Sequence, residues 1–180
     1  EKQPFDPSRQ GTVNAGVYIL EPEVLDYIPA ATPWSLERQL FPRLVREKQL
    51  VLGYLPEQPY YWIDVGHIEA YLQANYDAAS GAWPWCNSGV DATARVASGA
   101  QIVPPVIIGA YATIEPGATV GPYTVIGEGS LIGRGAQVVR SVVWGAAVVG
   151  EGAKLHEAVV VSGASVNSQA EVIGQVVIAR

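Results

Sequence analysis

Residues 106–138 read VIIGAYATIEPGATVGPYTVIGEGSLIGRGAQV, and a Val or Ile returns at every sixth position from 108 to 138. The same period runs from Val90 to Ile178, with two steps of five residues that lead to Val143 and Val160. The positions of this first series are Val90, Val96, Ile102, Ile108, Ile114, Val120, Ile126, Ile132, Val138, Val143, Val149, Leu155, Val160, Val166, Val172 and Ile178. A unit of six residues is too short for two helices and fits a short strand with a turn, so three units form one coil of a solenoid.

A second series of small or β-branched residues lies four positions after the first. Its members are Ala94, Ala100, Val106, Ala112, Ala118, Thr124, Ser130, Ala136, Val142, Ala147, Ala153, Val159, Ala164, Ala170 and Val176. We expect both series to point into the solenoid, the second near corners where only small side chains fit. The two five-residue steps fall 17 residues apart, at the same corner of successive coils. Residues 90–180 then hold about five coils, stacked at the strand spacing.

Residues 1–79 follow a different pattern, in which expected strands and helices alternate as in an α/β domain. The expected strands are 13–20, 50–55 and 60–65, and the expected helices are 21–28, a helix that starts at Thr32-Pro33 and is divided by Pro42, and 67–79. Such a segment is too small for a complete α/β domain, so we interpret it as the last part of a larger one. We expect residues 80–89 to be a connector in which Trp83 and Trp85 pack the junction.

The charge distribution excludes several classes of partner. Residues 1–89 carry a net charge of −5 and residues 90–180 a net charge of −1, and neither part has the basic stripe that nucleic acid or an anionic membrane requires. A single cysteine, Cys86, rules out an internal disulfide. With no apolar run of membrane-spanning length and no signal peptide, we expect a cytoplasmic protein. Because the chain starts at Glu1 and contains no Met, we interpret it as a fragment.

Three motifs come in an order that resembles the end of the catalytic domain in sugar-1-phosphate nucleotidyltransferases. They are Asn14–Leu20, Leu36–Pro42 and Trp62–Gly66. With hexapeptide repeats behind them, the chain is most similar to the mannose-1-phosphate guanylyltransferase (GDP-mannose pyrophosphorylase) branch. The resemblance implies a left-handed parallel β-helix over 90–180. It also implies an enzyme that joins a sugar-1-phosphate and an NTP to give an NDP-sugar and pyrophosphate, with Mg²⁺.

The resemblance also implies roles for five residues. Glu1, Lys2, Asn14 and Gly16 correspond to the sugar-phosphate-binding positions of the family, and Asp64 corresponds to the carboxylate that holds the metal. These residue types suit the chemistry, since phosphoryl transfer depends on charge neutralisation and alignment, and Mg²⁺ prefers oxygen ligands. From the residues alone, Asp64 is better explained as the cap of the helix that begins near His67, and Asn14 and Gly16 as a turn.

The chain departs from the family pattern at several points. Gln3 displaces the Pro that follows Glu-Lys, and His67 replaces the Thr that often follows Gly66. The Gly-rich loop that cradles the triphosphate is absent, so we expect this chain alone to be inactive. The base and the sugar are not determined, and syntheses of dTDP-glucose and of UDP-sugars stay open.

Two other classes of function remain as alternatives. The first is an acyl-CoA-dependent hexapeptide acyltransferase, with His156 as general base. The unbroken period leaves no room for the long loop that such enzymes extrude, and two histidines are too few for the three zinc ligands of a γ-class carbonic anhydrase. The second alternative is a purely structural scaffold. We also expect self-association through the β-helix, with Val139, Trp144 and Val161 as outward apolar candidates.

Overall fold

The computed structural model describes residues 12–58 and 60–179. The chain forms two compact units that divide between Trp62 and Ile63, and each is described by itself. The boundary expected from the sequence, with a connector at 80–89, stays a prediction. Helix α2 (Ile68–Ala79), which precedes this connector, belongs to the same compact unit as the repeats.

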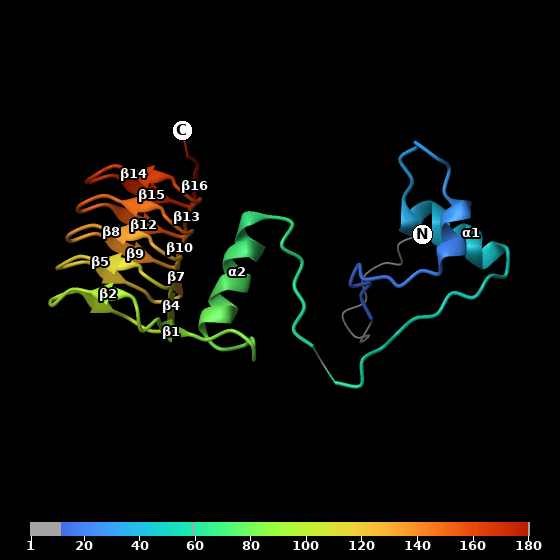
Figure 1. Ribbon diagram of the computed structural model, residues 1–180, viewed down its shortest axis with the longest axis horizontal. Coiled ribbons are helices and arrows are strands. Elements are labelled where there is room, and N and C mark those ends of the chain that lie inside the picture. The colour runs from blue at the N-terminus through green and yellow to red at the C-terminus, as the bar shows by residue number, and fades with distance from the viewer. Residues whose placement is uncertain (1–11, 59, 180) are drawn as a thin grey trace. The chain divides into compact units, whose positions relative to one another are not determined.

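The second unit contains a parallel β-helix whose short strands build three sheets (Figure 1). The first sheet is β1 (Gly89–Val90), β4 (Val106–Ile108), β7 (Thr124–Ile126), β10 (Val142–Val143), β13 (Val159–Val160) and β16 (Val176–Val177). The second is β2 (Arg95–Val96), β5 (Thr113–Ile114), β8 (Leu131–Ile132), β11 (Val148–Val149) and β14 (Ser165–Val166). The third is β3 (Gln101–Ile102), β6 (Thr119–Val120), β9 (Gln137–Val139), β12 (Lys154–His156) and β15 (Glu171–Ile173). Every strand pairs in parallel with the strand one coil away, which is consistent with the expected left-handed β-helix.

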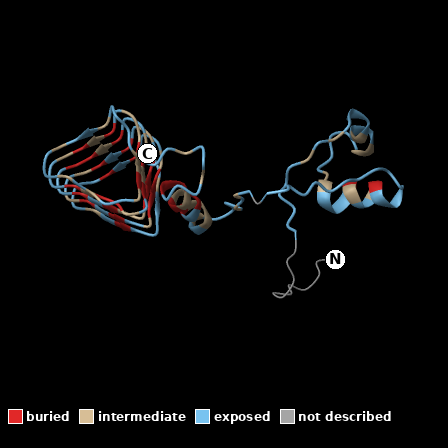
Figure 2. Ribbon diagram, turned by 90° about the horizontal axis from the view of Figure 1, so that it is seen from below, coloured by how far each residue is buried: buried red, intermediate tan, exposed pale blue. Residues whose placement is uncertain are grey.

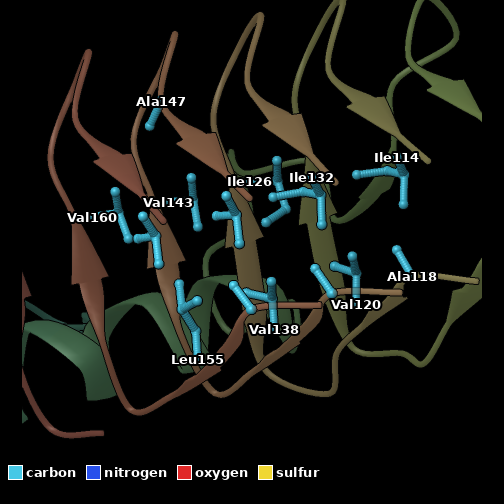
Figure 3. Packing of buried hydrophobic residues seen from close by; sticks show 14 of the residues in the cluster. Ile114, Ala118, Val120, Ile126, Ile132, Val138, Val143, Ala147, Leu155 and Val160 are labelled. Atoms are coloured by element: carbon cyan, nitrogen blue, oxygen red, sulfur yellow. The ribbon is translucent and has the colours of Figure 1, made fainter. Parts of the chain in front are cut away.

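The aliphatic residues of the first series fill the interior of this β-helix, as the period predicts (Figure 3). In the middle coils they are completely or almost completely buried, and Ala118 and Ala147 of the second series lie beside them. Val90 and Val96 are 46% and 39% exposed, because the first coil has no coil beneath it. Burial therefore depends on stacking, as expected for a repeat that buries its face only against its neighbours.

The coil register corrects two details of the sequence prediction. A third five-residue step leads from Val172 to Val177, which pairs with Val160 and packs against the core, so the expectation that Ile178 points inward is wrong. Ile178 is 67% exposed. Where a step is shortened to five residues, the small inward residue comes one position earlier than the second series predicts. The buried Ser141 and Ala158 therefore occupy these corners. The expectation that Val142 and Val159 point into the core is therefore wrong, and Val176 in the same row is 51% exposed.

Helix α2 (Ile68–Ala79) explains why Val142 and Val159 are nevertheless buried. The two valines form a small cluster with Leu72 and Tyr76 of α2, on the outer face of the first sheet. This face of α2 appears red beside the β-helix in Figure 2. The helix expected at 67–79 is thus confirmed, and the sheet supplies the apolar surface that its inward face needs.

The described part of the first unit contains three short helices, joined by chain without regular secondary structure. The helices are η1 (Pro22–Tyr27), a 3₁₀-helix; η2 (Leu36–Leu40), a π-helix; and α1 (Phe41–Arg46). They confirm the expected helix at 21–28 and the division at Pro42, where the missing amide prevents a regular helical bond. The helix start lies further along than expected, since Ser35 is the N-cap and its side chain accepts a hydrogen bond from the amide of Arg38.

The strands expected at 13–20, 50–55 and 60–65 are not formed in the part of the chain that the structure describes. A strand needs a hydrogen-bonded neighbour, and the described residues supply none to these segments; the first of them instead turns at Gly16, where φ is +73°. Val17 and Ile19 are accordingly 83% and 101% exposed. In the connector, Trp83 is half-buried but Trp85 is 73% exposed, so the expectation that both tryptophans pack the junction is wrong for Trp85.

Candidate functional site

The turn Asn14–Gly16 is the first of the two sites that the sequence predicts. The amide of Gly16 donates a hydrogen bond to Asn14 Oδ1 at 3.0 Å, which closes the turn. Gly16 has a φ of +73°, a conformation that side chains with a Cβ rarely adopt. The backbone geometry therefore favours a glycine here by itself, apart from any binding role of the turn.

Two further residues hold the Asn14 side chain, and sequence reasoning missed both as site residues. Asn14 Nδ2 donates to Glu37 Oε1 at 2.9 Å and to the hydroxyl of Tyr18 at 2.7 Å. The Tyr18 hydroxyl in turn donates to Glu37 Oε1 at 2.8 Å. The signal was present, because Tyr18 and Glu37 belong to two of the motifs that carry the family resemblance. Asn14, Tyr18 and Glu37 are called the polar triad below.

The charge of Glu37 also affects the titration of Tyr18. The hydrogen bond from Asn14 lowers the pKa of Tyr18, but the hydrogen bond to Glu37, burial and the negative charge of Glu37 together raise the pKa above its ordinary value. The hydroxyl therefore stays protonated and keeps its role as a donor. The triad offers an amide, a phenol and a carboxylate on an exposed surface, groups that can exchange hydrogen bonds with sugar hydroxyls.

The second predicted site, Asp64, lies in the other unit, just before α2. Asp64 Oδ1 accepts a hydrogen bond from the amide of Gly66 at 3.0 Å. The N-cap of α2 is His67, whose Nδ1 lies 3.3 Å from the amide of Ala70. His67 and not Asp64 therefore caps the helix, although the sequence alone also allowed this role for Asp64. The expected helix start near His67 is confirmed.

Glu69 completes the first turn of α2. Its carboxylate lies 3.0 Å from His67 Nδ1, and both groups are largely exposed. A backbone hydrogen bond at Glu69 itself, followed by the interaction with His67, lowers the pKa of Glu69 despite a small opposing effect of burial. A carboxylate in the first helical turn also interacts favourably with the helix dipole.

As a metal ligand, Asp64 offers one exposed carboxylate. No three His, Cys, Asp or Glu side chains gather in metal-binding geometry anywhere in the described residues. Mg²⁺ is commonly held by one or two protein carboxylates, with water and substrate phosphates as its other ligands. Asp64 fits the role of a single ligand of this kind, and it does not form a metal site by itself.

The structure brings some of the predicted site residues together and leaves others apart. Asn14 and Gly16 share one turn, whereas Asp64 belongs to the second unit, so the two sites are described separately. Glu1 and Lys2 lie outside the described residues. His156, the residue of the acyltransferase alternative, is exposed on β12. No helix of the described chain is long and apolar enough to cross a membrane.

Comparison with curated proteins finds relatives that are nucleotidyltransferases. The UTP–glucose-1-phosphate uridylyltransferase of Synechocystis sp. is 30% identical over 154 residues, which is 79% of this chain and 39% of that protein. The mannose-1-phosphate guanyltransferase of Saccharomyces cerevisiae is 47% identical over 60 residues, 33% of this chain and 16% of that protein. The mannose-1-phosphate guanylyltransferase of Mycobacterium tuberculosis is 31% identical over 125 residues, 65% of this chain and 34% of that protein. The chain thus spans well under half the length of these relatives.

Among solved structures, a perosamine N-acetyltransferase from Caulobacter crescentus aligns with 50% of this chain and 47% of that chain, at 17% identity and a TM-score of 0.38. This similarity is too low to carry an argument about fold or activity.

Family models match nearly the whole chain, in two parts. The model described as Nucleotidyl transferase matches residues 1–81, and the model described as GMPPB C-terminal domain matches residues 102–180. By these matches the chain belongs to the sugar-1-phosphate nucleotidyltransferase family, as a C-terminal part that ends in a GMPPB-type β-helix.

Proposed function

We propose that the chain is the C-terminal part of an enzyme that makes GDP-mannose from mannose-1-phosphate and GTP, with release of pyrophosphate. The observation that carries this proposal is the order of the two family matches. A nucleotidyl transferase segment at 1–81 is followed by a segment of the GMPPB C-terminal type at 102–180. Relatives named as mannose-1-phosphate guanylyltransferases support the choice of mannose.

Asn14 and Gly16 bind the sugar in this proposal. Gly16 allows the turn its positive φ, and Glu37 and Tyr18 hold the Asn14 amide in one orientation, so that it can recognise a sugar hydroxyl. Hydrogen bonds from a held side chain bind a sugar more tightly than those from a freely rotating one, because less rotamer entropy is lost on binding. Glu1 and Lys2 are proposed to contact the sugar hydroxyls and the phosphate.

Asp64 is proposed to serve as one ligand of the Mg²⁺ ion. When bound, Mg²⁺ neutralises phosphate charge during the transfer. The protein holds the Asp64 carboxylate in place through the hydrogen bond from the Gly66 amide.

We further propose that the protein is cytoplasmic and that the β-helix mediates self-association.

A second candidate specificity is UTP with glucose-1-phosphate. It is favoured by the Synechocystis relative, whose alignment covers 79% of this chain. The acyltransferase alternative lacks comparable support, because the strands continue from β1 to β16 with no long inserted loop and His156 is exposed.

The experiment that tests the proposal is an assay of the complete product of the gene with Mg²⁺. Mannose-1-phosphate and glucose-1-phosphate are each combined with every NTP, and pyrophosphate release is followed. Release with GTP and mannose-1-phosphate is expected, and release only with UTP and glucose-1-phosphate would assign the second specificity. Asn14→Ala is expected to raise KM for the sugar phosphate, whereas Asn75→Ala, on α2 outside the triad, serves as the matched control. No release with any pair would overturn the proposal.

A further inference from the structure

The third sheet of the β-helix presents a face with two straight rows of side chains. Pairing of β9, β12 and β15 aligns Gln137, Lys154 and Glu171 in one row. The same register aligns Val139, His156 and Ile173 in the second row. The two rows on β9, β12 and β15 are called the third-sheet face. Whereas α2 covers part of the first sheet, the side chains of this face are exposed, apart from the half-buried Val139.

A shallow hollow of about 270 Å³ is centred on β12 in this face. The six side chains of the face surround it, and Leu155 contributes to its floor. Beside the hollow stands Ile173, which is 57% exposed. An exposed aliphatic knob next to a hollow is a shape that a second copy of the same face can complement.

The charges of the third-sheet face are also self-complementary. Lys154 and Glu171 are neighbours in one row, yet within the described chain neither forms an ion pair. In a second copy that approaches with its coils running in the opposite direction, the order of the two charges is reversed. Each Lys154 can then face a Glu171, and the contact is made twice by symmetry.

We propose that the third-sheet face binds a second copy of this chain, with a twofold axis parallel to the strands and midway between β12 and β15. Lys154 then faces the partner's Glu171, and His156 faces the partner's Ile173, which enters the hollow over β12. This proposal deepens the self-association proposed above and rests on it. An axis through β12 itself would instead place the two Lys154 side chains together, a like-charge contact that opposes binding.

The extent of the third-sheet face predicts how tight the dimer is. Each copy contributes a few side chains, far fewer than the 20–30 or so of a standard stable interface, so association in the micromolar range is expected. The rows contain both charged and aliphatic groups, which favours a defined register over an unspecific apolar contact.

Sedimentation of the full chain over micromolar concentrations tests the proposal. The chain is expected to dimerise, and Lys154→Glu or Glu171→Lys is expected to raise the dissociation constant by roughly tenfold. The double variant Lys154→Glu/Glu171→Lys exchanges the charges and is expected to return to the affinity of the unaltered chain. Ile173→Asp removes the knob and is expected to leave a monomer. Arg95→Glu, a charge reversal on the second sheet, is the matched control and leaves the dimer unchanged.

The outcomes separate the two proposals. A monomer at every concentration overturns self-association itself. A dimer whose affinity is indifferent to Lys154→Glu and Ile173→Asp, or is not restored by the double variant, overturns this face and leaves self-association standing. Because these three side chains are exposed, each variant is expected to fold, which circular dichroism checks.

Discussion

The guanidinium of Arg140 lies 4.6 Å from the centre of the Tyr76 ring, so that a residue of the β-helix stacks on a residue of α2. The Tyr76 hydroxyl donates a hydrogen bond to the backbone carbonyl of Arg140 at 2.5 Å. Arg140 also lies 5.7 Å from the ring centre of Tyr123 and pairs with Glu157 at 2.9 Å. Burial raises the pKa of Tyr76 although the charge of Arg140 opposes this, so the hydroxyl remains a donor at neutral pH. These contacts join α2 to the repeat.

Replacing Tyr76 is expected to undock α2. Tyr76→Ala removes a 5%-exposed ring from the cluster on the first sheet and is expected to destabilise the second unit by about 3 kcal/mol. Tyr76→Phe keeps the ring and loses the hydroxyl, which is expected to cost about 1 kcal/mol. Urea unfolding measures both, with Tyr54→Ala at an 85%-exposed site as control. Equal effects at the two tyrosines would contradict the docking.

A methyl group at a β-helix corner is expected to be unfavourable. A Cβ on Gly127 would meet the backbone nitrogen of Gly145 in the next coil, and neither backbone can move without disturbing the stack. Gly127→Ala is expected to destabilise the second unit by about 1–3 kcal/mol. Gly53→Ala, where a Cβ has open space and the backbone needs no positive φ, is the control in thermal unfolding. A melting temperature unchanged by Gly127→Ala would show that the coils can separate freely.

The last coil offers a test of the 17-residue register. Val177 packs against the core and Ile178 is exposed, so Val177→Asp is expected to loosen β16 while Ile178→Asp leaves it intact. The physical reason is that an unpaired carboxylate is unfavourable in an apolar interior. Amide hydrogen exchange over β16 measures the difference. Greater exchange in the Ile178 variant would instead support the six-residue step.

The polar triad is expected to respond to removal of the Glu37 charge. Glu37→Gln removes the charge that disfavours tyrosinate, so the pKa of Tyr18 is expected to fall. Because its pKa is raised in the folded state, Tyr18 contributes stability below its unfolded pKa, and this contribution is lost as the pH rises through the folded pKa. Tyrosinate absorbance, taken as the difference from a Tyr18→Phe variant, follows the titration. Glu47→Gln, at the C-cap of α1 and outside the triad, should leave it unchanged.

Prediction from the sequence succeeded where one physical rule acts on every repeat. The aliphatic series predicted the buried residues from Ile108 to Val172, because every coil has to bury its inward aliphatic side chains in the same way. It failed at Ile178, since a six-residue and a five-residue step cannot be told apart where two neighbouring residues, Val177 and Ile178, are both aliphatic.

The candidate site could be predicted only in part. Asn14 and Gly16 were named through their motif, but their partner Glu37 is 23 residues from Asn14, and no local pattern connects the two. The expectation of strands before the repeat rested on the residue types in those segments alone. A strand also requires a neighbour, which composition does not supply.

By itself, the sequence determined the β-helix, the shortening of successive coils at one corner, and the turn at Gly16. These features follow from the local spacing of aliphatic residues and glycines. Only the tertiary structure decided that α2 packs on the first sheet, that Val142 and Val159 point outward beneath it, and that Glu37 holds Asn14. These contacts join residues distant in sequence, and their existence depends on which surfaces remain uncovered once the coils have stacked.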